Sequence, residues 1–404
     1  MRVLTFLHSF EPGGVERVAL RLVRRWREVG VDAPLFIVRD EGALRDELAS
    51  DLNFSLPPRP ARWSGPLESW WMIFKLPAEI RRVKPDLLFC AGNTYTVVCV
   101  VMKLMLGPDC PPIVAKISND LVLPGLSPWL RFLYGRWAWL QGRLIDGWVI
   151  MHPSMRAEVR ATIGGVDLAV ISDPALTTAQ LTGLQLWRPR QDDAPGRRFV
   201  AMGRLVAQKN YPLMLDAFAL GAGPEDRLTI FGDGPGRAEL EALATDLGLA
   251  GRVHFAGHVP QSAEALLDHD ILLLSSRYEG IPAALIEAMA CGMPIVATDC
   301  GDGVRGLLEG CGRARLVEAH DVAAFSAAIG LACRGEAVTA AEHFDAAAFT
   351  IEAGAESYLD TFARIVNDAP HRRRGELLGN HDYAPGELAP VSVRVQPDSS
   401  REAA

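Results

Sequence analysis

The feature that most constrains this 404-residue chain is a regular alternation of short apolar segments and amphipathic stretches. The apolar segments have the length and composition of buried strands, and each is followed by a pattern with helical periodicity. Such alternation predicts an α/β fold, with parallel sheets covered by helices on both faces. In the first half of the chain, strands are expected at 2–9, 34–40, 85–92, 112–118, 147–152 and 168–173.

The alternation is interrupted once, where the sequence GLQLWRPRQDDAPGRR is polar, charged and proline-containing. We therefore expect a first domain over 1–182, a linker over 183–197 and a second domain over 198–343. Five strand–helix units in the second domain predict a doubly wound, Rossmann-like sheet, whose ligand binds beyond the carboxyl ends of the strands. Its strands are expected at 198–203, 227–234, 252–257, 270–276 and 293–299.

Composition excludes several other classes of protein. A net charge of −8 argues against a nucleic-acid partner, because phosphate binding depends on Lys and Arg. The seven cysteines are scattered without a CxxC pair, so neither a zinc site nor a disulfide framework is expected. The apolar run at 97–107 is too short to span a bilayer, and the N-terminus has no signal-peptide cleavage site. We expect a cytoplasmic enzyme.

The loop GRLVAQKN follows the first strand of the second domain. Gly203 allows a close backbone turn, and Arg204 and Lys209 can reach the same anion, as a diphosphate would require. A solvated turn with exposed basic side chains is the alternative.

Two glycine-rich turns are candidate backbone cradles. The turn GDGP, at 232–235, precedes a helix in the second domain, and EPGG in the first domain carries Gly13 and Gly14 before another helix. Free amides at a helix start bind anions, although such turns also simply connect strands to helices.

The segment SSRYEGIPAALIEAMACGMPIVATD has two glutamates around the start of a small-residue helix. Pro282 suits the first helical turn, and free amides near 281–284 would face phosphate oxygens. Glu287 could accept hydrogen bonds from a vicinal diol such as ribose, and Glu279 would lie near a sugar. The alternative is an acid before the helix that is favoured by the helix dipole, plus an ordinary surface acid on the helix.

Together these motifs resemble the retaining glycosyltransferases of family 4, which have the GT-B fold: two Rossmann-like domains facing a central cleft. The resemblance is carried by GGVERV, GRLVAQKN, GDGP, FAGHVP and the E-x7-E segment that starts at Glu279. It implies that the second domain binds a UDP- or GDP-sugar and that a saccharide or lipid-linked acceptor enters from the first. It also implies that the helical pattern at 344–365 crosses back to the first domain. The polar, aperiodic sequence of 366–404 predicts a mostly disordered tail.

The resemblance assigns roles to individual residues. Arg204 and Lys209 would stabilise the departing diphosphate, while Glu279 would contact the donor sugar. Glu287 would bind the ribose. The remaining expected substrate contacts are Gly13, Gly14, Gly203, Gly232, Val259, Gly280, Ile281, Pro282 and Ala283, with Asn119 and Asp120 on the acceptor side. Fixed cations and a helix N-terminus would make a metal or other cofactor unnecessary, and Asp299 and Asp302 are expected to be loop residues.

Two stretches depart from the family pattern. Many relatives carry a histidine at the end of a first-domain strand, where this chain reads AKISND, with Asn119 and Asp120. After the last strand of that domain, relatives often have Asn-Gly or Asn-Pro, and this chain has ISDPAL.

An aromatic and basic helix is expected over 126–148. Its leucines are explained by packing on the domain's own sheet, which we favour, and equally by an amphipathic helix resting on an anionic membrane. A second aromatic, basic stretch at 63–84 keeps peripheral membrane contact at the inner face open.

The resemblance implies sugar transfer in bacterial surface polysaccharide assembly. Two alternatives remain open: a sugar-nucleotide epimerase on the same fold, and a non-catalytic scaffold that binds nucleotide sugar. An epimerase needs acid and base residues that the sequence does not place. A scaffold has no need of the set Arg204, Lys209, Glu279 and Glu287.

Overall fold

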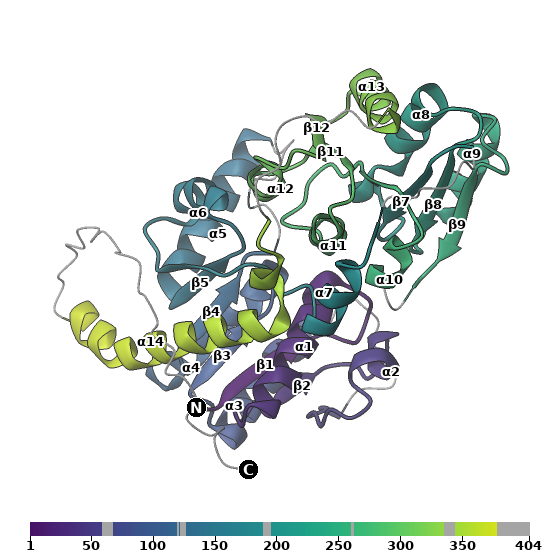
Figure 1. Ribbon diagram of the computed structural model, residues 1–404. Helices are drawn as coiled ribbons and strands as arrows, with labels where there is room; N and C mark the ends of the chain where they lie inside the picture. Colours follow the sequence, from purple (N-terminus) through teal and green to yellow (C-terminus); the bar gives the residue numbers. More distant parts are fainter. Residues whose placement is uncertain are drawn as a thin grey trace, which may run out of the picture. The chain divides into compact units, whose positions relative to one another are not determined.

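The computed structural model describes residues 1–58, 68–118, 121, 127–188, 195–259, 262–334 and 344–377 (Figure 1). Residues 1–367 form one compact unit that holds both sheets, and residues 368–404 are a second unit. Among the described helices, none is long and apolar enough to cross a bilayer. All seven cysteines are free thiols.

The first sheet has six parallel strands in the order β2-β1-β3-β4-β5-β6. Each lies inside a range expected from the sequence: β1 Val3–Leu7, β2 Leu35–Ile37, β3 Leu87–Cys90, β4 Ile113–Lys116, β5 Gly147–Ile150 and β6 Leu168–Val170. Its α-helices are α1 Gly14–Glu28, α2 Leu44–Leu48, α3 Glu68–Val83, α4 Thr96–Leu106, α5 Pro128–Leu144 and α6 Arg156–Ile163. Helix α7 (Thr178–Leu184) follows β6 and contacts α10 (Ser262–Leu266) and α11 (Ala283–Cys291) of the second sheet. Short 3-10 helices are η2 Asn93–Tyr95, η3 Gly107–Asp109 and η4 Pro153–Met155.

The strand order fixes which face of the first sheet each helix covers. The chain moves from β1 to β2 in one direction and from β2 through β6 in the other, and right-handed crossovers then place α3, α4, α5 and α6 in one layer. Within this layer α4 contacts α3 and α5, and α5 also contacts α6. The opposite face is left to α1 and the C-terminal helix.

The second sheet also has six parallel strands, in the order β12-β11-β10-β7-β8-β9. Its strands are β7 Arg198–Met202, β8 Arg227–Phe231, β9 Val253–Gly257, β10 Ile271–Leu274, β11 Ile295–Asp299 and β12 Ala314–Glu318. Its helices are η5 Ala207–Lys209, α8 Tyr211–Gly221, α9 Arg237–Asp246, α10 Ser262–Leu266, α11 Ala283–Cys291, α12 Asp302–Leu308 and α13 Val322–Cys333. The predicted α/β fold is therefore confirmed.

Two elements of the second sheet were not expected. The sequence indicated five strand–helix units, whereas β12 and α13 form a sixth at the edge of the sheet. The strand reads ARLVE and is mostly half-buried, so it lacks the continuous apolar run of a central strand.

The C-terminal helix α14 spans Ile351–Leu377, so the expected helix at 344–365 starts later and continues into the predicted tail. The 3-10 helix η6 (Ala346–Phe349) precedes it. In Figure 1 the part of α14 that belongs to the first unit, residues 351–367, runs along the first sheet next to α1. Edge-to-face contacts join Trp26 of α1 to Phe362 at 5.4 Å and Phe89 of β3 to Tyr358 at 5.2 Å between ring centroids. All four rings are fully buried, so α14 completes the core around the first sheet. We call the part of the chain built on the first sheet the first lobe and the part built on the second sheet the second lobe.

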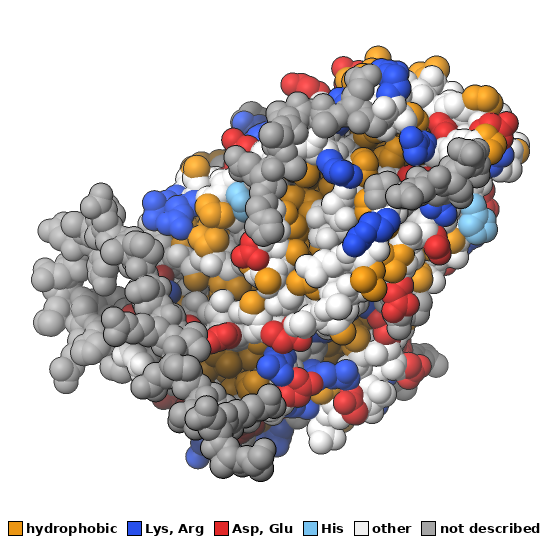
Figure 2. Space-filling view, in the orientation of Figure 1, with side chains coloured by type: hydrophobic (Ala, Val, Ile, Leu, Met, Phe, Trp, Pro, Cys, Tyr) orange, Lys and Arg blue, Asp and Glu red, His pale blue; other side chains and the backbone are white. Residues whose placement is uncertain are grey.

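Figure 2 shows acidic and basic side chains interspersed on one face of the molecule, with apolar side chains between them. No charge of a single sign dominates the described part of this face.

Candidate active site

The topology of the second sheet places the candidate site between two loops. The strand order reverses between β10 and β7, and doubly wound sheets bind ligands in the crevice at such a switch point. The loop after β7 carries Arg204 and Lys209, and the loop after β10 carries Glu279. Residues about 70 positions apart in the sequence are thereby brought to the same edge of the sheet.

Lys209 and Glu279 are in direct contact there. The Lys209 Nζ atom lies 2.5 Å from Glu279 Oε1, and the Ser276 hydroxyl donates to the same oxygen at 2.8 Å. The exposed fractions of the two charged side chains are only 16% and 8%. The lysine is therefore held at the switch point in a fixed position.

The backbone around Lys209 requires two unusual conformations. Gly203 has φ +151°, and a Cβ at this position would come within 2.9 Å of Lys209 Cε. Asn210, with φ 49°, reverses the chain into α8. Tyr211 donates to the Gly203 carbonyl at 3.0 Å, and its pKa is raised by burial and by the nearby Glu279 carboxylate. Gly203 thus leaves the space through which the lysine side chain passes.

Arg204 contrasts with Lys209. Its side chain is exposed and has no hydrogen-bond or ion-pair partner among the described residues. Of the two predicted cations, the lysine is held by an ion pair and the arginine is exposed to solvent.

The GDGP turn packs directly on the loop after β7. Gly232 has φ +139°, and a Cβ there would lie 2.0 Å from the Gly203 carbonyl oxygen. The Gly232 amide donates to the Gly257 carbonyl at 2.8 Å. The glycines of this turn therefore permit backbone-to-backbone packing beside the site. Val259, after β9, is half-buried.

The segment that follows Glu279 forms the start of α11. Pro282 is the N-cap residue rather than part of the first helical turn, and the helix starts at Ala283. Gly280 and Ile281 are buried. A Cβ at Gly280 would lie 2.3 Å from the carbonyl oxygen of Ser118, the second residue after β4, so this loop touches the edge of the first sheet.

Glu287 lies on α11 and is 3% exposed. Burial lowers the pKa of Arg21 on α1, and Glu287 acts in the opposite direction, so the two charges are near each other. The Arg21 guanidinium also donates to the Ala175 carbonyl at 2.6 Å. Nothing in the sequence singles out Arg21, because one arginine on an amphipathic helix is ordinary.

On the first sheet, Gly13 is the N-cap of α1 and Gly14 its first residue. A Cβ on Gly13 would lie 2.2 Å from Glu16 Oε2, so the acid occupies the space over this helix start. The Tyr95 hydroxyl donates to the other carboxylate oxygen of Glu16 at 2.8 Å. Asn119 and Asp120 lie outside the described residues.

The sequence suggested that Asp299 and Asp302 are loop residues, and the structure shows that they are not. Asp299 ends β11, Asp302 begins α12, and both form ion pairs with Arg305, at 2.8 and 2.7 Å. No group of three or more His, Cys, Asp or Glu side chains that could hold a metal is present in the part of the chain that the structure describes.

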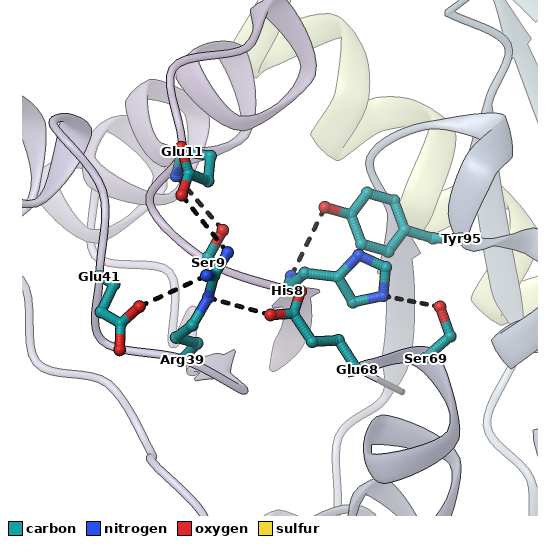
Figure 3. A network of polar contacts seen from close by, with 8 residues as sticks. All are labelled: His8, Ser9, Glu11, Arg39, Glu41, Glu68, Ser69 and Tyr95. Carbon is teal, nitrogen blue, oxygen red and sulfur yellow. Dashed lines mark hydrogen bonds and ion pairs between the residues drawn. The ribbon is translucent and has the colours of Figure 1, made fainter. Parts of the chain in front are cut away.

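A polar network that the sequence did not indicate lies at the carboxyl ends of β1, β2 and β3 (Figure 3). The ring of His8 stacks at a tilt on Tyr95, with centroids 4.6 Å apart, and its Nε2 lies 3.1 Å from Ser69 Oγ. Arg39 forms ion pairs with three acids: Glu11, Glu41 and Glu68. Burial, followed by the charge of Arg39, lowers the pKa of His8 to about 4, so the imidazole is neutral at neutral pH.

The lowered pKa of His8 leads to a prediction about the stability of the protein in acid. The pKa of His8 is lower in the folded than in the unfolded protein. Its contribution to the free energy of unfolding is therefore intact above about pH 6.5 and is lost as the pH falls toward 4. The loss is at most about 3 kcal/mol in the free energy of unfolding. Urea unfolding at about pH 7 and about pH 4.5 is expected to show a smaller acid loss in His8→Gln than in the wild type. An equal loss in both proteins would contradict the assignment.

Two family models match the chain. The model "Glycosyl transferases group 1" matches residues 188–350, which include the whole switch-point site, and "Glycosyltransferase Family 4" matches residues 12–173. The chain belongs to the group 1 and family 4 glycosyltransferases. Its fold is GT-B, with two Rossmann-like domains.

Two relatives of this glycosyltransferase have names that refer to bacterial lipopolysaccharide. It is 26% identical over 331 residues to the lipopolysaccharide core biosynthesis glycosyltransferase LpsE of Rhizobium meliloti. The matched region covers 81% of this chain and 87% of that protein. It is 31% identical over 155 residues to the lipopolysaccharide 1,6-galactosyltransferase of Salmonella typhimurium, over 36% of this chain and 41% of that protein.

Among solved structures, Anabaena Alr3699/HepE in complex with UDP-glucose superimposes with a TM-score of 0.63 at 19% identity. The superposition covers 93% of this glycosyltransferase and all of that chain. At this level of identity, the similarity supports the fold and carries no residue assignment.

Proposed function

We propose that this glycosyltransferase moves a sugar from a UDP- or GDP-sugar to a saccharide or lipid-linked saccharide acceptor, with retention of anomeric configuration. We place the reaction in the assembly of bacterial surface polysaccharide, in the cytoplasm at the inner face of the membrane. The observation that carries the proposal is the contact between Lys209 and Glu279 at the switch point of the second sheet. The names of LpsE and of the HepE complex with UDP-glucose support the substrate class.

The reaction requires stabilisation of charge on the departing diphosphate. The bond between the anomeric carbon and the phosphate oxygen breaks, the acceptor oxygen bonds to the anomeric carbon on the same face, and the acceptor proton leaves on a phosphate oxygen. Lys209 and the exposed Arg204 would oppose the charge that develops, together with the N-terminus of α11. These groups act without a metal in this proposal.

The glutamates have separate binding roles. Glu279 is nearly buried beside the lysine. Lys209 and Ser276 both contact its Oε1 atom, and its second oxygen would accept a hydrogen bond from the donor sugar. Glu287, one to two turns into α11, would accept from the ribose hydroxyls. Burial makes each hydrogen bond to a carboxylate stronger than at the surface.

Calorimetric titration with UDP, GDP and ADP in EDTA tests the donor site. We expect one of the first two nucleotides to bind selectively in the wild type and to lose at least tenfold in affinity in Lys209→Ala, because an ion pair to phosphate is removed. Lys103→Ala is the matched control: its ammonium is also half-buried and paired, 2.6 Å from Asp146, but lies on α4. No binding of any nucleotide would overturn the donor-site assignment.

The product then separates the remaining alternatives. With the selected nucleotide sugar and a saccharide acceptor, NMR of the new linkage should show the anomeric configuration of the donor. Release of an altered nucleotide sugar without acceptor would indicate an epimerase instead. Tight nucleotide binding without any turnover would indicate a scaffold.

A further inference from the structure

The first lobe has an unusual concentration of exposed aromatic side chains. Every exposed Trp and Phe among the described residues lies on α3 or α5: Trp70, Phe74, Trp129, Phe132 and Trp139. Helix α4 contacts both α3 and α5, so these side chains lie on one layer of helices. Large exposed apolar side chains gathered on one layer mark an interaction site, whereas single ones are ordinary. We call these five residues, with the exposed Leu130 and Leu133, the aromatic surface.

Helix α5 is turned so that its aromatic side faces outward. Trp129 and Phe132 are 66% and 59% exposed and stack with ring centroids 6.1 Å apart. Ala138 and Gln141 face inward and are buried. The expectation that the leucines of α5 pack on the sheet is therefore only partly met, because Leu130 and Leu133 are 50% and 44% exposed.

Positive charge accompanies these rings. The guanidinium carbons of Arg136 and Arg143 lie 4.9 and 5.2 Å from the Trp139 ring centroid, and Arg131 is also exposed. Helix α5 contains no acidic residue, although the chain as a whole has a net charge of −8. The local charge is thus opposite in sign to that of the protein.

The position of the surface relates it to the active site. Helices that connect parallel strands run antiparallel to them, so the first turns of α3 and α5 lie toward the carboxyl edge of the first sheet. Trp70, Phe74, Trp129 and Phe132 all belong to the first two turns of their helices. The same edge carries Ser118, which touches the loop after Glu279.

We propose that the aromatic surface docks this protein on an anionic lipid bilayer. Tryptophan and phenylalanine enter the interface between head groups and acyl chains, while arginines extend to the phosphates. The binding itself is independent of catalysis. Its purpose, presenting the carboxyl edge of the first sheet to a lipid-linked acceptor, rests on the proposed function.

Flotation of the full chain with vesicles tests the docking. We expect the wild type to float with phosphatidylcholine–phosphatidylglycerol vesicles, to remain behind with phosphatidylcholine alone, and to dissociate as salt is raised. Trp129→Ser/Phe132→Ser should lower the partition coefficient roughly tenfold or more. Arg136→Gln/Arg143→Gln should remove most of the salt dependence.

Two controls keep the test decisive. Leu186→Ser/Leu220→Ser removes apolar side chains that are 72% and 73% exposed elsewhere, and should leave flotation unchanged. Nucleotide binding by calorimetry should be unchanged in all variants, which shows that each is folded. The proposal is overturned if the wild type does not float, if it floats equally with neutral vesicles, or if the serine variant floats like the wild type. It is also overturned if that variant only abolishes a dimer, since the aromatic surface would then join two copies of this chain.

Discussion

Replacing Lys209 with methionine is expected to lower kcat/KM about 100- to 1,000-fold. The ammonium is the preorganised positive charge at the switch point, fixed 2.5 Å from Glu279 in a mostly buried position. Charge that develops on the diphosphate in the transition state would lose this partner. Methionine keeps much of the aliphatic volume, so the change is mainly electrostatic. Steady-state kinetics with the nucleotide sugar identified by calorimetry measures it.

The control separates catalysis from folding. Lys209→Met leaves the Glu279 carboxylate buried with one hydrogen bond from Ser276, which will also lower stability. The double variant Lys209→Met/Glu279→Gln removes that unpaired charge and should recover stability without recovering activity. Lys103→Met, which breaks an ion pair of similar burial on α4, should keep near-normal kinetics. A kcat/KM for Lys209→Met close to that of Lys103→Met would contradict the assigned role.

The largest effect on stability is expected from Lys116→Met, which should cost about 3–5 kcal/mol in the free energy of unfolding. Lys116, at the end of β4, forms an ion pair with Asp173, and the exposed fractions of the two side chains are 3% and 8%. Removing the lysine leaves a nearly fully buried carboxylate without its ion-pair partner. Tyr358 of α14 lies near this charge, since burial and Asp173 both raise its pKa. Denaturant unfolding measures the loss.

Two comparisons make this stability prediction specific. Lys116→Met/Asp173→Leu removes both charges and should be close to the wild type, because a buried pair can often be replaced by apolar residues. Arg2→Met breaks the exposed pair with Asp32, in which the exposed fractions are 44% and 56%, and should cost about 1 kcal/mol or less. Equal losses for Arg2→Met and Lys116→Met would refute the argument.

This ion pair also joins the two stretches that depart from the family pattern. Lys116 belongs to the stretch AKISND, and Asp173 belongs to ISDPAL. Each looked like an isolated irregularity in the sequence. In the structure they are one feature, because β4, β5 and β6 are neighbours and bring the two strand ends together.

The sequence predicted the fold well where one strong periodicity decided it. The strands from β7 to β11 stand out as apolar runs, and the switch-point rule then placed Lys209 and Glu279 at the same edge. It could not predict that the two side chains touch, because this depends on the φ angles of Gly203 and Asn210.

Other features depend on contacts between distant parts of the chain. The His8 network needs Ser69 and Tyr95, and the neighbour of Glu287 is Arg21 on the other lobe. The orientation of α5 was ambiguous for a different reason. Apolar and aromatic residues occur on every side of this helix, so periodicity alone does not indicate which side is buried.

The packing of α14 on α1 and β3 has a consequence for the synthesis of this protein on the ribosome. The first lobe has all its strands once β6 is made, yet Trp26 and Phe89 meet Tyr358 and Phe362 only after nearly 200 more residues. At roughly 5–20 residues per second, the wait is about 10–40 s. While the second lobe is translated, the surface around Trp26 and Phe89 in the nascent chain therefore lacks the helix that covers it. A chaperone that binds this exposed aromatic surface would increase the yield of folded enzyme.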